Sequence, residues 1–128
     1  MNETTEKILL LPRFTAFAGN GPYYTAPINI RAYSRADITA WASLGFGTSR
    51  STIQVSVEES PDLDSWFALG GLIGSTPESE ETTRVPSSPA TFRFDWLRLR
   101  VELTGTDTMG NAPVLTAWAV GNFVRRET

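Results

Sequence analysis

Few residues in this chain could do chemistry, because two of the most useful types are missing. Its 128 residues include no cysteine and no histidine. Without cysteine there is no thiolate nucleophile, no disulfide and no sulfur ligand for a metal. Without histidine the serine–histidine–aspartate triad, imidazole metal sites and the commonest general base are excluded. We therefore expect a non-enzymatic protein with no catalytic residues, no cofactor and no metal.

An acidic cluster is the first candidate site to weigh against that expectation. Its four carboxylates are those of Glu58, Glu59, Asp62 and Asp64. Calcium prefers several oxygen ligands on one short loop, but the remaining ligands and the glycine of a calcium loop are missing here. Ser60-Pro61-Asp62 is instead typical of a turn, after which the next strand would begin at residues 64–65. The turn is the favoured interpretation, with a metal site as the alternative.

Two weaker motifs also have structural explanations. A pair of carboxylates could serve glycoside hydrolysis, but among fourteen acidic residues some pair must fall within range. The Gly45-Phe46-Gly47 segment is a fragment of a dinucleotide-binding pattern, and a strand rather than a helix is expected after it. We interpret this segment as a hairpin turn.

Aromatic side chains are the most suggestive group: Tyr23, Tyr24, Trp41, Trp66, Trp96 and Trp118. Trp41 is out of phase with Ile38, Ala40 and Ala42, so it faces outward if those small residues face the core. Exposed aromatic rings mark partner surfaces or platforms for sugars. Two other interpretations stay open: Trp41 faces the core and the alanines lie outside, or both faces of the strand are covered. Trp66 follows a turn and is expected to close one end of the core.

The charged residues give a second candidate surface. Eleven residues are basic, Lys7 is the only lysine, and the net charge is −3. A mildly acidic chain is a poor candidate for nucleic-acid binding. Arg98 and Arg100 share one strand face with Glu102, which indicates either routine cross-strand ion pairs or a charged docking surface.

The elements that would position these residues are strands. Apolar and polar residues alternate with period two, turn residues separate the runs, and no helical periodicity is found. We expect strands at 7–17, 27–35, 37–45, 52–59, 65–73, 80–85, 90–95, 96–104 and 113–124. The phase slips by one residue near Asp95 or Trp96, which indicates a β-bulge. The prediction is an antiparallel, jelly-roll-like β-sandwich of eight or nine strands.

The expected domain organisation is simple. Residues 1–6 are polar and are predicted to form an N-terminal arm, and residues 7–128 form one β-sandwich domain. Residues 74–89 are rich in serine, proline and glutamate and are predicted to form a long exposed loop. The apolar run from Ile8 to Leu11 is too short for a signal peptide or a membrane span. We expect synthesis in the cytoplasm and no membrane partner.

Three segments together resemble a known class of protein. They are LLPRFTAFAG at 10–19, VEESPDLDSW at 57–66 and LRLRVELTGT at 97–106. The order resembles that of small β-sandwich virion proteins of tailed bacteriophages. The resemblance implies a virion location after synthesis in the bacterial host. It also implies a capsid decoration or cement role, or a neck or tail accessory role. The implied partners are major capsid or neck proteins and further copies of the chain, as a trimer or larger ring.

Five residues are the predicted partner interface: Tyr23, Tyr24, Trp41, Arg98 and Arg100. The alternative function is a carbohydrate-binding jelly-roll module, in which Trp41, Tyr23 and Tyr24 would stack on sugar rings. Neither the position in the particle nor the strand pairing follows from the sequence.

Overall fold

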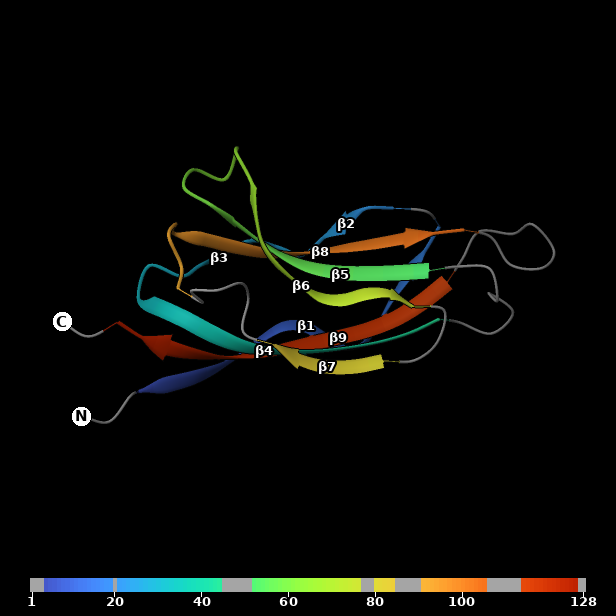
Figure 1. The fold of residues 1–128 in the computed structure, drawn as a ribbon, viewed down its shortest axis with the longest axis horizontal. Coiled ribbons are helices and arrows are strands. Elements are labelled where there is room, and N and C mark those ends of the chain that lie inside the picture. Colours follow the sequence, from blue (N-terminus) through green and yellow to red (C-terminus); the bar gives the residue numbers. More distant parts are fainter. Residues whose placement is uncertain are drawn as a thin grey trace.

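The computed structural model is built entirely from strands in the part of the chain that it describes (Figure 1). The described residues are 4–19, 21–44, 52–76, 80–84, 91–105 and 114–126. They form nine strands: β1 (Thr5–Ala18), β2 (Tyr23–Tyr24), β3 (Ile28–Asn29), β4 (Tyr33–Leu44), β5 (Thr52–Ser60), β6 (Phe67–Thr76), β7 (Glu80–Arg84), β8 (Trp96–Thr104) and β9 (Val114–Arg125). The all-β prediction is confirmed.

The strands form two antiparallel sheets that lie over one another (Figure 1). Sheet A has the order β1-β9-β4-β7, and sheet B has the order β2-β8-β5-β6, with β3 also paired to β8. Because β2 and β3 both pair with β8, they act as one strand that is interrupted around Pro27. Counted this way, the two four-stranded sheets have the strand order of a jelly roll. The predicted sandwich and jelly-roll architecture is therefore confirmed.

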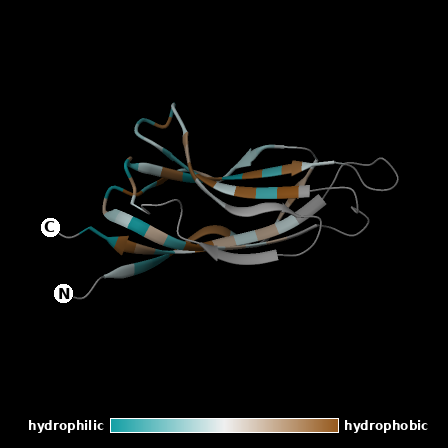
Figure 2. Cartoon of the chain, in the orientation of Figure 1, coloured by the Kyte–Doolittle hydropathy of each residue, from teal (hydrophilic) through white to brown (hydrophobic). Residues whose placement is uncertain are grey.

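The core lies between the sheets and is filled unequally by them. Along β8 every second side chain is fully buried: Leu97, Leu99, Val101 and Leu103. Sheet A contributes several small residues at the facing positions: Ala36, Ala40, Ala42, Ala117 and Ala119. Large residues facing small ones let the two layers pack closely. Figure 2 shows the same alternation of hydrophobic and hydrophilic residues along β5 and β8, so sheet B keeps a second, outward face.

Two predicted strands are rearranged. The segment predicted at 27–35 breaks at Arg31-Ala32, where the Tyr33 amide donates to the Ile30 carbonyl oxygen (2.9 Å). This tight turn separates the two-residue β3 from β4. As a result, β4 already begins at Tyr33 and takes in nearly all of the strand predicted at 37–45.

The strand predicted at 90–95 is wrong for its described residues, 91–95, and so is the β-bulge near Asp95 or Trp96. The backbone there bonds to different segments instead of one neighbouring strand. The Phe92 amide donates to the Ser34 carbonyl (2.7 Å), and the Asp95 carbonyl accepts from the Ile30 amide (2.7 Å). The phase slip therefore marks the point where a connecting segment enters β8.

Two boundaries also differ from the predicted domain organisation. Thr5 and Glu6 are not part of a free arm, because they pair with the end of β9 and extend β1. The predicted loop at 74–89 is partly strand: β6 continues through Thr76, and β7 pairs with β4 over residues 80–84. β7 matches the strand predicted at 80–85, which is therefore confirmed for its described residues. The rest of the predicted loop lies outside the described residues.

Candidate functional site

The acidic segment that follows β5 forms the predicted turn. Ser60 Oγ accepts from the Leu63 amide (2.8 Å), and Asp62 Oδ1 accepts from the amides of Asp64 (2.9 Å) and Ser65 (2.8 Å). These two donors hold the pKa of the Asp62 carboxyl below its ordinary value. Leu63 adopts a left-handed conformation, with φ at 69°. The turn interpretation is confirmed, although β6 begins only at Phe67.

The two glutamates before this turn each bind an arginine, and their carboxylates point in different directions instead of forming one site. Glu59 is fully buried and accepts from Arg93 Nε at 2.9 Å. Glu58 faces the other way and accepts from Arg98 Nε at 2.8 Å. No group of three metal-ligating side chains is found among the residues that the structure describes.

The outer face of sheet B carries a stacked arginine. The Arg98 guanidinium lies 3.9 Å from the centre of the Tyr24 ring and 4.0 Å from that of Trp66. Its ion pair with Glu58 completes the arrangement, and the Arg98 side chain is only 18% exposed. Cation–π contacts strengthen when the cation is partly desolvated, so Arg98 is fixed in one orientation.

Arg100 lies on the same outer face of sheet B, two residues after Arg98 along β8. Its Nη1 donates to Glu102 at 2.6 Å. Hydrogen bonds from Arg100 to Glu102 and Tyr24 raise the pKa of its guanidinium above the ordinary value. The cross-strand ion pair is confirmed for Arg98, which pairs with Glu58 on β5, whereas Arg100 pairs with Glu102 on its own strand. Their role as a docking surface stays a prediction. We call Tyr24, Trp66, Arg98 and Arg100 the sheet B surface.

The prediction that Trp66 closes one end of the core is wrong. Its ring lies against Arg98, and its indole N–H donates to the Leu63 carbonyl oxygen at 3.3 Å. The turn at residues 61–65, just before Trp66 in the sequence, projects beyond the sheet (Figure 1). The sequence alone did not reveal that an arginine two strands away would hold the ring.

Tyr23 faces the interior. Its ring packs against Phe17 with 5.1 Å between centroids and contacts the core cluster. Its hydroxyl donates to the Gly19 carbonyl oxygen at 2.8 Å and also to that of Ala18. Tyr23 therefore joins the end of β1 to β2, and its ring is not presented to solvent with that of Tyr24.

Trp41 lies on the outer face of sheet A. Its neighbours along β4, Ala40 and Ala42, are buried, and its partner across the sheet is Trp118 on β9. The interpretation that places Trp41 in the core is wrong. The structure thus puts Tyr23 inside, Tyr24 on sheet B and Trp41 on sheet A, so these three rings do not share one surface.

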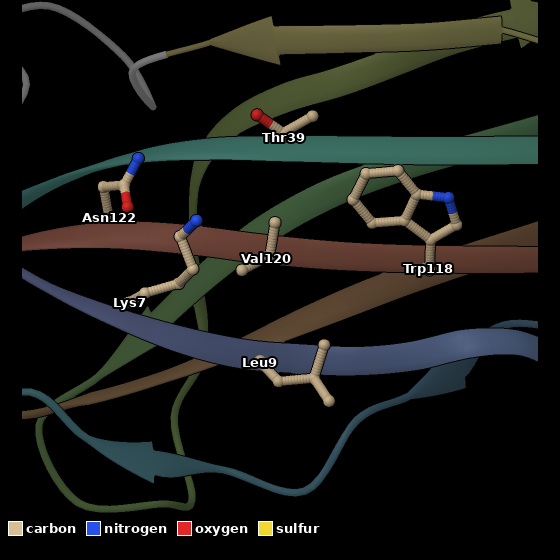
Figure 3. Close-up of a pocket in the computed structure, with 6 residues that line it drawn as sticks. All are labelled: Lys7, Leu9, Thr39, Trp118, Val120 and Asn122. Atoms are coloured by element: carbon tan, nitrogen blue, oxygen red, sulfur yellow. The ribbon is translucent and has the colours of Figure 1, made fainter.

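A hollow of about 430 Å³ lies on the same outer face of sheet A (Figure 3). We call it the sheet A hollow, and its lining comes from three strands: Lys7, Leu9, Thr39, Trp118, Val120 and Asn122. Sequence reasoning noted Trp118 but did not connect it with these residues. In the sequence Trp118 stands between Ala117 and Ala119, both of which are buried, and this alternation could have indicated that Trp118 faces outward.

Structural comparison finds this fold in proteins of infectious bursal disease virus. A chain of the Gx strain structure matches with a TM-score of 0.63 and 12% identity, over 98% of this chain and 33% of that one. The VP2 subviral particle matches with a TM-score of 0.60 and 9% identity, over 96% of this chain and 33% of VP2. This chain therefore spans about a third of the length of either relative. At such identities the likeness shows a shared jelly-roll fold and no more.

Sequence comparison adds no relative. No protein-family model matches the chain, and neither does any curated protein.

The described residues contain no helix long and apolar enough to span a membrane.

Proposed function

We propose that this chain is a non-enzymatic structural component of a virus particle. The observation that carries the proposal is the fold, which nearly the whole chain shares with part of the protein in the VP2 subviral particle. A fold alone does not imply a function. The proposal therefore also rests on a surface suited to assembly, and on the absence of cysteine and histidine for catalysis.

The sheet B surface is the proposed contact with neighbouring subunits. Tyrosine, tryptophan and arginine are the residue types that most often dominate protein interfaces. Arg98 is already held between Tyr24 and Trp66, so little side-chain entropy remains to be lost when a partner binds. Tyr24 is 48% exposed and offers apolar area beside the guanidinium. This arrangement suits a preorganised interface.

The finer proposal is a capsid decoration or cement protein of a tailed bacteriophage that associates with copies of itself and docks on the capsid. A neck or tail accessory role in the same kind of particle is the alternative. The support is the resemblance of three segments to phage β-sandwich proteins, together with the jelly-roll fold. Trp41, on the opposite sheet, is a second proposed contact.

The solution mass of the purified chain tests self-association. Light scattering behind a sizing column, at two concentrations, should give a trimer or a larger ring. Arg98→Ala and Tyr24→Ala should shift the mass toward the monomer, because each removes one half of the stacked pair. Lys7→Ala, on the other sheet, is the matched control and should leave the mass unchanged.

A monomer at both concentrations would contradict the proposed self-association. An oligomer that persists in Arg98→Ala and Tyr24→Ala would place the interface away from the sheet B surface. Circular dichroism of each variant checks that it is folded.

A further inference from the structure

The side chains that line the sheet A hollow change from polar at one end to aromatic at the other, and they come from three strands. Strand register aligns Lys7 on β1 with Asn122 on β9, and Leu9 with Val120. It also aligns Thr39 on β4 with Val120. The next position along β9 is Trp118. Alternate residues of a strand lie about 7 Å apart, so the floor runs for about 14 Å from a polar end to an aromatic end.

The aromatic end presents the face of a ring. In Figure 3 the Trp118 indole reaches from β9 toward β4 and lies broadside to the viewer, who looks onto the outer face of the sheet. Val120 and Leu9 lie beside it, and Leu9 is 58% exposed. A flat indole with small apolar neighbours is a platform on which an apolar ring face can stack.

The polar end offers groups that can bind a ligand. Figure 3 shows the amine of Lys7 reaching over β9 toward Asn122, with the Thr39 hydroxyl on the far side of Val120. Within the described part of the chain, neither Lys7 nor Asn122 makes a side-chain hydrogen bond or ion pair. An amide both donates and accepts, and an ammonium donates three hydrogen bonds. These two groups can therefore bind hydroxyl oxygens without breaking an existing contact.

The chemistry of the lining selects one class of ligand. Phosphate-bearing ligands need several cations, and single-stranded nucleic acid needs a basic groove, whereas Lys7 is the only charged side chain among the described residues that line this hollow. An extended peptide adds to a sheet edge, which in sheet A means β1 or β7, whereas the floor of the hollow runs along β9, which is paired on both sides. A purely apolar ligand would leave Lys7 and Asn122 without partners. A neutral ring with one apolar face and several hydroxyl groups fits both ends.

We propose that the sheet A hollow binds a saccharide, with one sugar ring stacked on Trp118 and the hydroxyls of a neighbouring sugar bound by Lys7 and Asn122. The length of the floor exceeds a single pyranose, which favours a short oligosaccharide. This inference goes beyond the structural role in a particle and does not depend on it. A surface glycan of a cell or a free polysaccharide would offer the same chemistry.

A glycan array tests the inference. The purified full chain is applied to an array of microbial, plant and animal oligosaccharides, and the strongest binder is then titrated while tryptophan fluorescence is followed. We expect at least one saturable binder. Trp118→Ala should weaken it roughly tenfold or more, because a stacked aromatic contact is lost. Trp118→Tyr should keep most of the affinity.

The polar end has its own variants and a matched control. Lys7→Ala and Asn122→Ala should each weaken binding by about three- to tenfold, as expected for one lost hydrogen bond. Phe67→Ala removes another exposed aromatic ring, on the opposite sheet, and should leave the affinity unchanged. Circular dichroism confirms that each variant is folded.

Three results would overturn the saccharide assignment. The first is an array with no binder for the folded chain. The second is a binder whose affinity is the same for wild type, Trp118→Ala and Asn122→Ala. The third is a Trp118→Ala variant that changes the solution mass but not glycan binding, because the hollow would then contact a second copy of the chain. None of these results bears on whether the chain belongs to a particle.

Discussion

At the scale of single residues, the most constrained charge is the Glu59 carboxylate. It is fully buried at the end of β5, and its partners are the Arg93 side chain and backbone amide. The Arg93 side chain is 64% exposed, so this pair joins one buried charge to one solvated charge. The two partners are therefore not equivalent, and removing them one at a time should have unequal effects.

We predict that Arg93→Ala destabilises the protein more than Glu59→Gln does. Without Arg93 the buried carboxylate keeps only a long backbone hydrogen bond, and the expected loss is on the order of 3 kcal/mol in the free energy of unfolding. Glu59→Gln removes the charge, leaves Arg93 in water and keeps an amide oxygen as acceptor, so about 1 kcal/mol is expected. Urea unfolding measures both. Equal losses would show that Glu59 is solvated.

A second prediction concerns pH and the turn after β5. The pKa of Asp62 is lowered in the folded chain, so ionised Asp62 stabilises the turn above the unfolded pKa of about 4. That stabilisation is lost as the pH falls through the lower, folded pKa. Wild type should therefore be more stable than Asp62→Asn at pH 7, and the difference should shrink below about pH 4.

The comparison isolates Asp62 because other carboxylates are present in both proteins. Glu6, whose pKa is lowered by its contacts with Tyr33 and Arg125, contributes to both unfolding curves. Free energies of unfolding measured from pH 3 to pH 7 provide the check. A difference that is constant over this range would mean that the charge of Asp62 does not support the turn.

At the scale of elements, β9 is a central strand of sheet A, because it lies between β1 and β4. Gly121 is buried in it, and an added Cβ would lie 2.5 Å from Cε1 of Phe123. The Phe123 ring is fully buried and packs against Tyr33 (5.4 Å) and Phe92 (6.0 Å). It has little room to move away.

Gly121→Ala should therefore lower the free energy of unfolding by about 1–3 kcal/mol, as overpacking does elsewhere. Gly71→Ala is the matched control, because a Cβ at that strand position meets nothing within 4 Å. Its effect should stay within about 0.5 kcal/mol. Thermal or urea unfolding distinguishes the two. A neutral Gly121→Ala would show that β9 can shift away from the core.

The elements also show what can be read from sequence. Strands β5 and β8 were predicted closely, because each has one buried and one solvated face and alternation reports that directly. Phe92 and Phe94 also alternate, yet their segment bonds to β4, to the connection between β3 and β4, and to the Glu59 side chain at the end of β5. Alternation reports burial of every second residue. It does not report which backbone is the hydrogen-bond partner.

Which residues come together in the candidate surfaces depends on the pairing register of the strands, and this register could not be predicted from the sequence. Arg98 was identified on a strand face, but its stacking on Trp66 depends on where a turn places that ring. Lys7 and Asn122 lie at opposite ends of the chain and meet only because β1 pairs with β9. Single residues of a site were visible in the sequence, whereas their combination was not.

At the scale of the whole molecule, the two sheets present different outer faces. Sheet B carries the stacked arginine and its ion pairs, and sheet A carries Trp41, Trp118 and the hollow. A sandwich with two chemically distinct faces can contact neighbouring subunits through one and a further ligand through the other. The proposed role in a particle uses sheet B, and saccharide binding uses sheet A.

The most direct test is whether the chain is part of a particle. Particles from the strain that encodes the chain are purified on a caesium chloride gradient, and an antiserum raised against the purified protein is used to probe every fraction. We predict that the chain peaks in the fractions that hold the major coat protein and stays there after a second gradient. A chain found only in the soluble fractions at the top of the gradient, while intact particles lack it, would contradict the account.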